Sequence, residues 1–207
     1  MGDGERILII LIPHSERKGV KAESALVKQL NPTKNILFSE EKLKLINEGR
    51  KLVSKEFQVK RDKLEPGYFR YQGVLYKNLA FNELKIENKL LWLPKIFVVN
   101  PYNGLAPLEE AIPYYKIKFS DKINGKSLKL FWREILNEVE LEEELYSLLP
   151  QEHSDVLKSW KLKQINFPEL PSMNNHGNKA VKGKFLAKVI ANNSLDKALK
   201  EFKAQVS

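Results

Sequence analysis

Short hydrophobic runs and longer amphipathic segments alternate unevenly along the 207-residue chain. Residues 7–12 are all apolar and end at Pro13, which predicts a buried central strand. A second apolar run at 95–99 precedes a Pro-Tyr-Asn-Gly turn and predicts another buried strand, and a last strand is predicted around 161–167. Residues 113–120 alternate between apolar and polar side chains, a pattern typical of a half-exposed strand.

Three segments have the periodicity of helices. Residues 39–57 form the first, with Ser39 as an N-cap and acidic residues in the first turn. Residues 127–149 are amphipathic and predict a long helix, either continuous or broken in two. The C-terminal part is predicted to be helical from about Lys179, with a second helix that begins after Ser194 as its cap.

The order of these elements indicates the fold class. Strands and helices do not alternate regularly, which favours an α+β fold, a mixed β-sheet packed by helices, over a regular doubly wound sheet. The chain has no internal repeat and no linker-like segment, so we expect residues 1–207 to form a single compact domain. A hydrophobic content of 43% is sufficient for a sizeable core.

The net charge of +9 adds a functional expectation. A basic surplus favours polyanionic partners such as nucleic acid, nucleotides or an anionic membrane face, although it can also reflect composition without any partner. The charges are segregated along the chain: residues 134–152 contain seven acids and no base, whereas residues 156–207 contain ten lysines and three acids. We therefore expect one strongly positive face.

Composition also excludes several classes of chemistry. The chain has no cysteine, which rules out disulfides, thiolate metal sites and cysteine nucleophiles and fits a reducing compartment. The apolar run at 7–12 is too short for a signal-peptide core or a membrane span. We expect a cytoplasmic protein that has no membrane association and no cofactor.

The C-terminal helix raises a question about its lysines. On a helical wheel, its buried stripe consists of Val181, Phe185, Leu186, Val189 and Ile190. Lys184 and Lys188 fall on the opposite side, but Lys179 and Lys182 fall within the apolar arc near the helix N-terminus. Inward ammonium groups there predict an anion or phosphate pocket, unless the lysines extend outward to solvent or pair with buried acids.

The loop after the first predicted strand raises the same question. Ser15, Glu16, Arg17 and Lys18 follow the carboxyl end of that strand, where ligands collect in open sheets with parallel strands. The loop lacks the glycines of a GxxxxGK phosphate loop, and a polar turn without a ligand is the alternative. His14 is either a general base or an exposed loop residue.

Five segments, taken in order, extend the interpretation. They are ILIILIPHSERKG (7–19), YQGVLYKNL (71–79), IPYYKIKFS (112–120), GKSLKLFWREIL (125–136) and HGNKAVKGKFLAKVI (176–190). Together they resemble the YaaA peroxide-stress-response family, through a Pro-x-Ser-x-x-Lys-like loop, an aromatic-x-Gly-x-x-Tyr segment, a Pro-x-Tyr strand, a Phe-Trp helix and an Asn-Lys-Ala-x-Lys-Gly signature.

The resemblance implies a compact α+β fold, a positively charged cleft, non-specific binding of double-stranded DNA and a role in limiting iron-driven oxidative damage. Two departures weaken the implied cleft. Ala106 stands where the family has an arginine, and Lys116 replaces another arginine with a point charge. The chain is also shorter than typical members, and it has no recognisable helix-hairpin-helix glycine hairpin.

Residue patterns and resemblance together give a set of site residues. The expected anion- or DNA-binding side chains are Ser15, Lys18, Lys116, Asn178, Lys179 and Lys182, and the expected cleft lining is Tyr76, Tyr115 and His176. The tyrosines could instead belong to the core, as we expect for Trp132.

Three functions from different classes fit this set. The first is a DNA-binding stress protein without catalysis, and the second is an enzyme that acts on a small phosphorylated or nucleotide-like substrate in the same cleft. The third, direct iron binding, is disfavoured because His14, His153 and His176 are scattered in the sequence and His153 lies in a segment expected to be a surface turn. We expect no metal site.

Overall fold

The computed structural model describes residues 7–19, 38–61, 63–139, 141, 143–168 and 175–207. Six strands of this part form the main sheet, in the order β10-β9-β8-β1-β3-β4. Their bounds are β1 (Leu8–Pro13), β3 (Ile96–Asn100), β4 (Gly104–Pro107), β8 (Glu144–Ser147), β9 (Leu162–Asn166) and β10 (Gln205–Val206). The central four run parallel and the two edge strands run antiparallel, so the sheet is mixed, as predicted.

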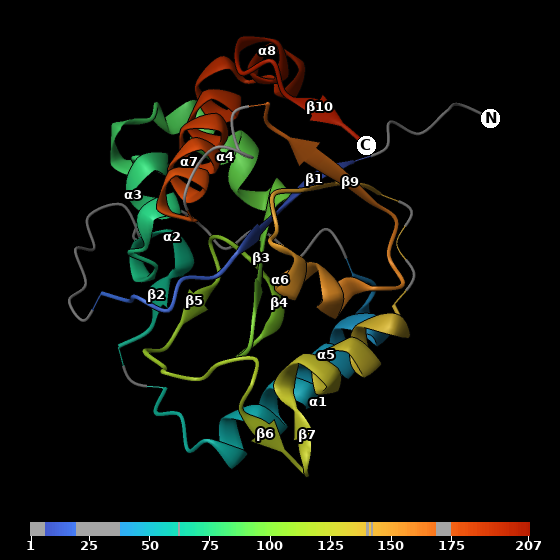
Figure 1. Cartoon of the computed structure of the whole chain (residues 1–207). Helices are drawn as coiled ribbons and strands as arrows, with labels where there is room; N and C mark the ends of the chain where they lie inside the picture. The colour runs from blue at the N-terminus through green and yellow to red at the C-terminus, as the bar shows by residue number, and fades with distance from the viewer. Residues whose placement is uncertain (1–6, 20–37, 62, 140, 142, 169–174) are drawn as a thin grey trace.

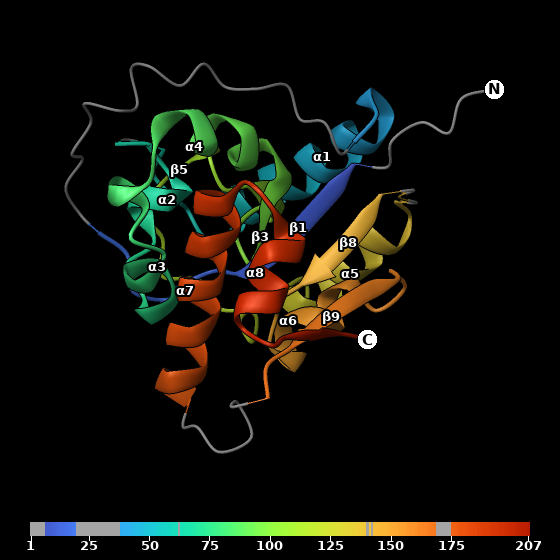
Figure 2. The same cartoon turned by 90° about the horizontal axis from the view of Figure 1, so that it is seen from above.

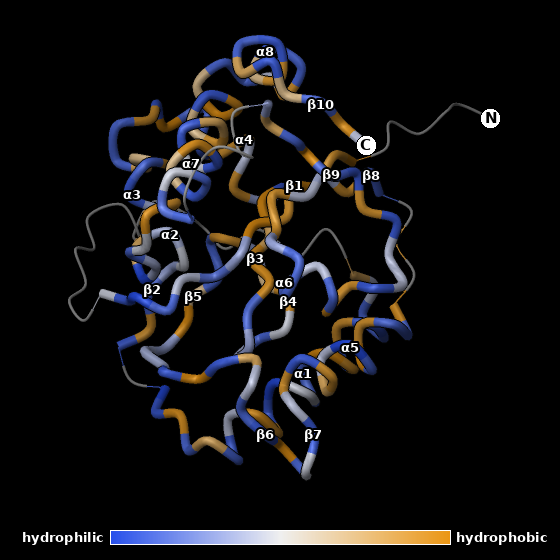
Figure 3. Tube along the Cα trace, in the orientation of Figure 1, coloured by the Kyte–Doolittle hydropathy of each residue, from blue (hydrophilic) through white to orange (hydrophobic). Residues whose placement is uncertain are grey.

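Strand β1 is the centre of the fold. Its apolar run pairs with β3 on one side and with β8 on the other, in register Ile10↔Ile96 and Ile10↔Tyr146. Residues 9–12 have no solvent exposure, because helices cover both faces of the sheet. Figure 3 shows the hydrophobic positions of β1 and β3 in the interior and mainly hydrophilic positions around α8.

Two groups of helices lie on opposite sides of the sheet (Figures 1 and 2). One group comprises α2 (Gly67–Arg70), α3 (Val74–Leu79), α4 (Ile86–Trp92), α7 (Asn175–Asn192) and α8 (Leu195–Glu201). The other comprises α1 (Glu40–Glu56) and α5 (Leu128–Asn137), and the short α6 (Gln151–Ser154) follows β8. Single 3₁₀ turns are η1 (Phe81–Glu83), η2 (Leu93–Lys95) and η3 (Asp155–Leu157). Two small ladders pair β2 (Glu65–Pro66) with β5 (Ala111–Ile112) and β6 (Lys122–Ile123) with β7 (Lys126–Ser127).

Most predicted elements are confirmed with small shifts in their bounds. The predicted caps are also confirmed, because the Ser39 and Ser194 side chains accept hydrogen bonds from the Lys42 and Lys197 amides. Helix α7 begins at Asn175 rather than near Lys179. None of the helices in the described ranges is long and apolar enough to cross a membrane.

Two predictions of secondary structure were wrong. Residues 113–118 alternate between buried and exposed side chains as predicted, but no described strand pairs with them. The predicted helix at 127–149 ends at Asn137, and β8 begins at Glu144. In β8, parallel pairing with β1 and β9 outweighs the helical propensity of an acidic segment.

Trp132 belongs to the core, as predicted. It is fully buried, and its indole N–H donates to the Pro101 carbonyl at 2.9 Å. The ring lies against Gly49 of α1 and Gly104, the first residue of β4, and a Cβ at either glycine would come within 3 Å of it. This tryptophan therefore joins α5 to α1 and to the end of β3.

Gly183 sets the close approach of α7 to α3. A Cβ at this position would lie 2.2 Å from the Leu75 carbonyl oxygen and 2.9 Å from the Asn78 side chain. A glycine inside a helix normally costs about 1 kcal/mol relative to alanine. Here the loss is offset because the two helix backbones pack almost directly on each other.

We expect Gly183→Ala to destabilise the protein by about 1–3 kcal/mol, since overpacking against a backbone carbonyl exceeds the gain in helix propensity. Urea unfolding measures the change. The exposed neighbour Lys184 supplies the control, because Lys184→Ala should leave the unfolding free energy within about 0.5 kcal/mol of the original. A more stable Gly183→Ala protein would contradict the packing argument.

Candidate functional site

The topology places a switch point between β1 and β8. From β1 the chain crosses to β3 on one side, and it later returns to β8 on the other side of β1. In open sheets with parallel strands, ligands bind beyond the carboxyl ends of the strands at such a point. A cavity of about 520 Å³ lies there, with walls from the loops after β1 and β8 and from α3 and α7.

The cavity is lined by side chains from distant parts of the sequence. Its cationic residues are Arg17, Lys77, Lys118 and Lys179, and its acids are Glu16 and Glu152. Its other polar or aromatic residues include His14, Ser15, Tyr76, Phe119, His153 and His176. Within the described part of the chain, none of the four cations forms an ion pair.

Backbone hydrogen bonds hold the loop after β1 in place. The His14 amide donates to the Val99 carbonyl, and the Gln72 amide donates to the Arg17 carbonyl. Ser15 is buried against Gly73, where a Cβ would lie only 2.4 Å from the serine Oγ. The start of α3 therefore closes tightly over the loop and brings Ser15 into the cavity wall.

His14 and His153 form a hydrogen-bonded pair in the cavity. Nδ1 of His14 and Nε2 of His153 are 2.9 Å apart, and the edge of Phe119 packs against both rings. Burial lowers the pKa of His14 well below its usual value, and the charges of His153 and Lys18 lower it further. Burial, with the nearby Lys179 and Lys182, lowers the pKa of His153 to about 4. Both rings are therefore neutral near pH 7.

Lys182 points inward, as the wheel predicted, but its partner is a carbonyl rather than an acid. Its Nζ donates to the Leu148 carbonyl oxygen at 2.8 Å, just after β8. Burial lowers its pKa to about 8. Since that value still lies above neutral pH, Lys182 carries a positive charge close to His153.

Lys18 is buried on the other side of the loop. Its Nζ donates to the Ser15 carbonyl oxygen at 2.9 Å and lies 4.0 Å from the centroid of the Tyr115 ring. Burial lowers the pKa of Lys18 to about 8. An aromatic face and a backbone carbonyl thus stabilise this ammonium group in place of a carboxylate.

The two predicted cleft tyrosines have different surroundings. Tyr76 lines the cavity, and its hydroxyl donates to the Pro13 carbonyl oxygen at 2.7 Å. Tyr115 is 3% exposed, shares a 2.9 Å hydrogen bond with the Tyr71 hydroxyl and lines none of the three described cavities. Burial raises the pKa of both tyrosines well above 10.

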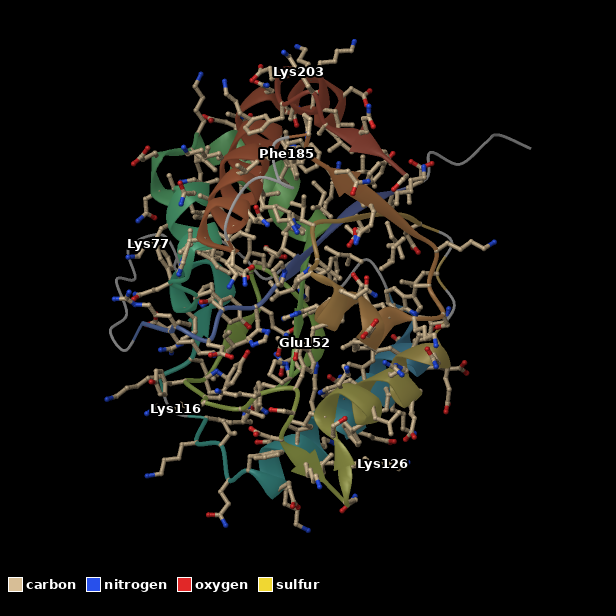
Figure 4. All side chains as sticks on the ribbon, in the orientation of Figure 1. Lys77, Lys116, Lys126, Glu152, Phe185 and Lys203 are labelled. Carbon is tan, nitrogen blue, oxygen red and sulfur yellow. The ribbon has the colours of Figure 1, made fainter. Side chains whose placement is uncertain are left out.

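The structure brings some of the predicted site residues together and separates others. Ser15, Tyr76, His176 and Lys179 line one cavity. Lys18 and Lys182 are hydrogen-bonded to backbone segments that border it. Asn178 is half-buried in α7, and its Oδ1 is buried without a partner. Lys116 is exposed at the outer surface, well away from Glu152 of the cavity (Figure 4). Ala106 is 2% exposed in β4 and lines none of the described cavities.

Sequence reasoning missed the histidine pair. His153 was expected on a surface turn, but it is 9% exposed, and His14 is not an exposed loop residue either. His14 follows an apolar strand directly, and that position was a usable signal. His153 lies in α6 beyond β8, and its position was hidden because β8 was predicted as helix. Lys77 and Lys118 were also missed.

Within the described residues, no group of three or more histidines or acids could hold a metal ion.

Comparison with known proteins identifies the family. Residues 8–205 match the family described as peroxide stress protein YaaA. The chain belongs to this family. A UPF0246 protein of Streptococcus equi subsp. equi is 27% identical over 147 residues, which cover 66% of this chain and 60% of that protein. A UPF0246 protein of Streptococcus agalactiae serotype Ia is 28% identical over 148 residues, 67% of this chain and 61% of the relative. The matched region thus spans about three-fifths of the length of these YaaA-like relatives.

The buried histidines have a consequence for stability. The pKa of His153 is about 6.5 in an unfolded chain and about 4 in the folded one, so the unfolded state binds more protons between these values. Stability is therefore complete above about pH 6.5 and falls as the pH decreases toward 4. The loss attributable to His153 alone is about 3 kcal/mol.

We expect the His153→Gln variant not to show this decrease in the free energy of unfolding. Urea unfolding over the same pH range measures it. His176→Gln is the control, because His176 is exposed and its removal should leave the pH dependence unchanged. The quantity compared is the slope of the unfolding free energy against pH. A constant destabilisation by either substitution does not change that slope. Equal slopes in the original protein and in His153→Gln would show that His153 is not buried as a neutral ring.

Proposed function

We propose that this YaaA-family chain binds DNA non-specifically through the basic cavity at the β1–β8 switch point, as part of the peroxide stress response. The stress role is that of the family to which the chain belongs. The observation that supports DNA binding is the convergence of Arg17, Lys77, Lys118 and Lys179 from four separate segments of the sequence. Unpaired cations gathered in one concavity favour a polyanion.

Charge balance around the cavity supports the same conclusion. Among the described lining residues, Glu16 and Glu152 are the acids that offset the four cations, and the charged Lys18 and Lys182 lie just behind the wall. Contacts from lysine and arginine to phosphates position nucleic acid without reading its sequence. Such binding should weaken steeply with salt, because each neutralised phosphate releases a counterion.

A small phosphorylated or nucleotide-like substrate is the second candidate. The enclosed shape of the cavity and the histidine pair at its wall favour it, since neutral imidazoles can act as general acids or bases. Native mass spectrometry of the purified protein distinguishes the candidates, because a retained phosphorylated molecule would support the second one. We retain DNA binding as the principal proposal because the described lining contains four cations and two acids.

We expect the double variant Lys118→Gln/Lys179→Gln to bind a short DNA duplex at least tenfold more weakly than the original protein at about 100 mM salt. Fluorescence anisotropy at salt concentrations from about 50 to 200 mM measures both the affinity and its salt dependence. The slope of log K against log salt should become shallower by about 2, since two phosphate contacts are removed.

The matched control is Lys184→Gln/Lys200→Gln, which removes the same charge from exposed positions on α7 and α8 outside the cavity. It should change the affinity by less than about threefold. Equal losses in the two double variants would indicate diffuse surface charge and contradict a defined cleft. Affinity that does not respond to salt would contradict phosphate binding altogether.

A further inference from the structure

The histidine pair leaves two buried nitrogens that have no hydrogen-bond partner among the described residues. These are Nε2 of His14 and Nδ1 of His153, the outer nitrogens of the pair. In the neutral pair, one N–H lies between the two rings, and the other N–H must occupy one of the outer positions. A buried donor without an acceptor is costly and calls for an explanation.

One additional proton changes the hydrogen-bonding character of the pair. With a single positive charge, the pair still shares one N–H between the rings, and both outer nitrogens become N–H donors. The protonated pair then has donors only. Its natural partner is an oxyanion, which has acceptors only and forms short charge-assisted hydrogen bonds.

Cations predominate among the described charged groups around the pair. Lys18, Lys179 and Lys182 act directly on one or both rings. Further cations line the same cavity from the loop after β1, from α3 and from the segment before β6, and they are Arg17, Lys77 and Lys118. The remaining titratable groups are Glu16, Glu152 and His176. These cations oppose protonation of the empty pair, which agrees with the lowered pKa of both rings. A bound anion would instead favour the protonated form of the pair and raise its pKa.

We propose that His14 and His153 form a subsite that binds one phosphodiester group of a nucleic-acid strand together with one proton. The inference rests on the proposed function, because the surrounding cations bring the strand to the cavity and the pair then receives one of its phosphates. The cavity, at about 520 Å³, has room for one phosphate with its adjoining sugars.

Coupling between the proton and the anion has a defined sign. The free protein holds fewer protons on the pair than the complex does, so binding takes up a proton. By linkage, affinity for the phosphodiester rises as the pH falls through the interval between the pKa of the free pair and that of the bound pair. Phosphodiesters remain singly charged across this interval, so the pH dependence belongs to the protein.

Oligothymidylate is the appropriate probe, because thymine does not titrate in this range. We expect the original protein to bind it about tenfold more tightly at about pH 5.5 than at about pH 7.5 at constant salt. His153→Gln should reduce the ratio to less than about twofold, because a single imidazole without its partner no longer shares the proton. Fluorescence anisotropy with a labelled oligomer measures these ratios.

His176→Gln is the decisive control, since His176 is an exposed imidazole that lines the same cavity and lies outside the hydrogen-bonded pair. This variant should keep the full pH dependence. If His176→Gln loses the dependence and His153→Gln keeps it, the proton binds at the exposed ring and the proposal is wrong. Affinity that is equal at the two pH values in the original protein would also overturn it.

A second measurement uses the unsubstituted protein and does not require DNA binding. Sulfate is an oxyanion that does not titrate in this range, and NMR can follow the His153 ring with and without it. We expect saturating sulfate to raise the pKa of His153 by about two units or more, which is the size of rise that an affinity ratio of about tenfold between about pH 5.5 and about pH 7.5 requires. An unchanged pKa would overturn the subsite. If oligothymidylate fails to bind at any pH while sulfate raises the pKa, the proposed DNA binding fails and the oxyanion subsite stands.

Discussion

Parallel pairing of β1 with β3 on one side and β8 on the other determines where chemistry can occur in this protein. Because all three strands run in the same direction, their carboxyl ends meet at one edge of the sheet. The loops that follow β1 and β8 therefore meet as well, and they bring together two histidines that are 139 residues apart in the chain. The cavity lies where that strand order reverses, since the chain continues from β1 to β3 on one side and from β8 to β9 on the other.

Two lysines at this edge have backbone carbonyls as hydrogen-bond partners, and neither forms an ion pair within the described part of the chain. Lys18 and Lys182 are held by the carbonyl oxygens of Ser15 and Leu148, which are backbone groups of the same two loops. Carbonyl dipoles stabilise an ammonium group but leave its full charge in place. A carboxylate partner would have cancelled that charge. Lys18 and Lys182 therefore keep their charge beside the cavity.

Local sequence patterns predicted the strands whose signal is strongest. The apolar runs of β1 and β3 and the serine caps of α1 and α8 were recognisable because burial and capping depend on neighbouring residues. Strand β8 was not recognisable, since its acidic residues favour a helix and only pairing with β1 and β9 makes it extended. The position of His153 depended on that pairing, and so the histidine pair could not be predicted. Lys182 was predicted to point inward by periodicity alone, whereas its carbonyl partner depends on the tertiary fold.

The contact at Gly183 also bears on the geometry of the cavity. Helix α3 carries Tyr76 and Lys77 on one wall, and α7 carries His176 and Lys179 on another. The two helices meet where α7 has no side chain, and the Leu75 carbonyl of α3 is the nearest atom to that point. A carbonyl cannot change rotamer as a leucine or methionine spacer could. The spacing between the helices that carry these two walls is therefore set by close backbone packing at Gly183.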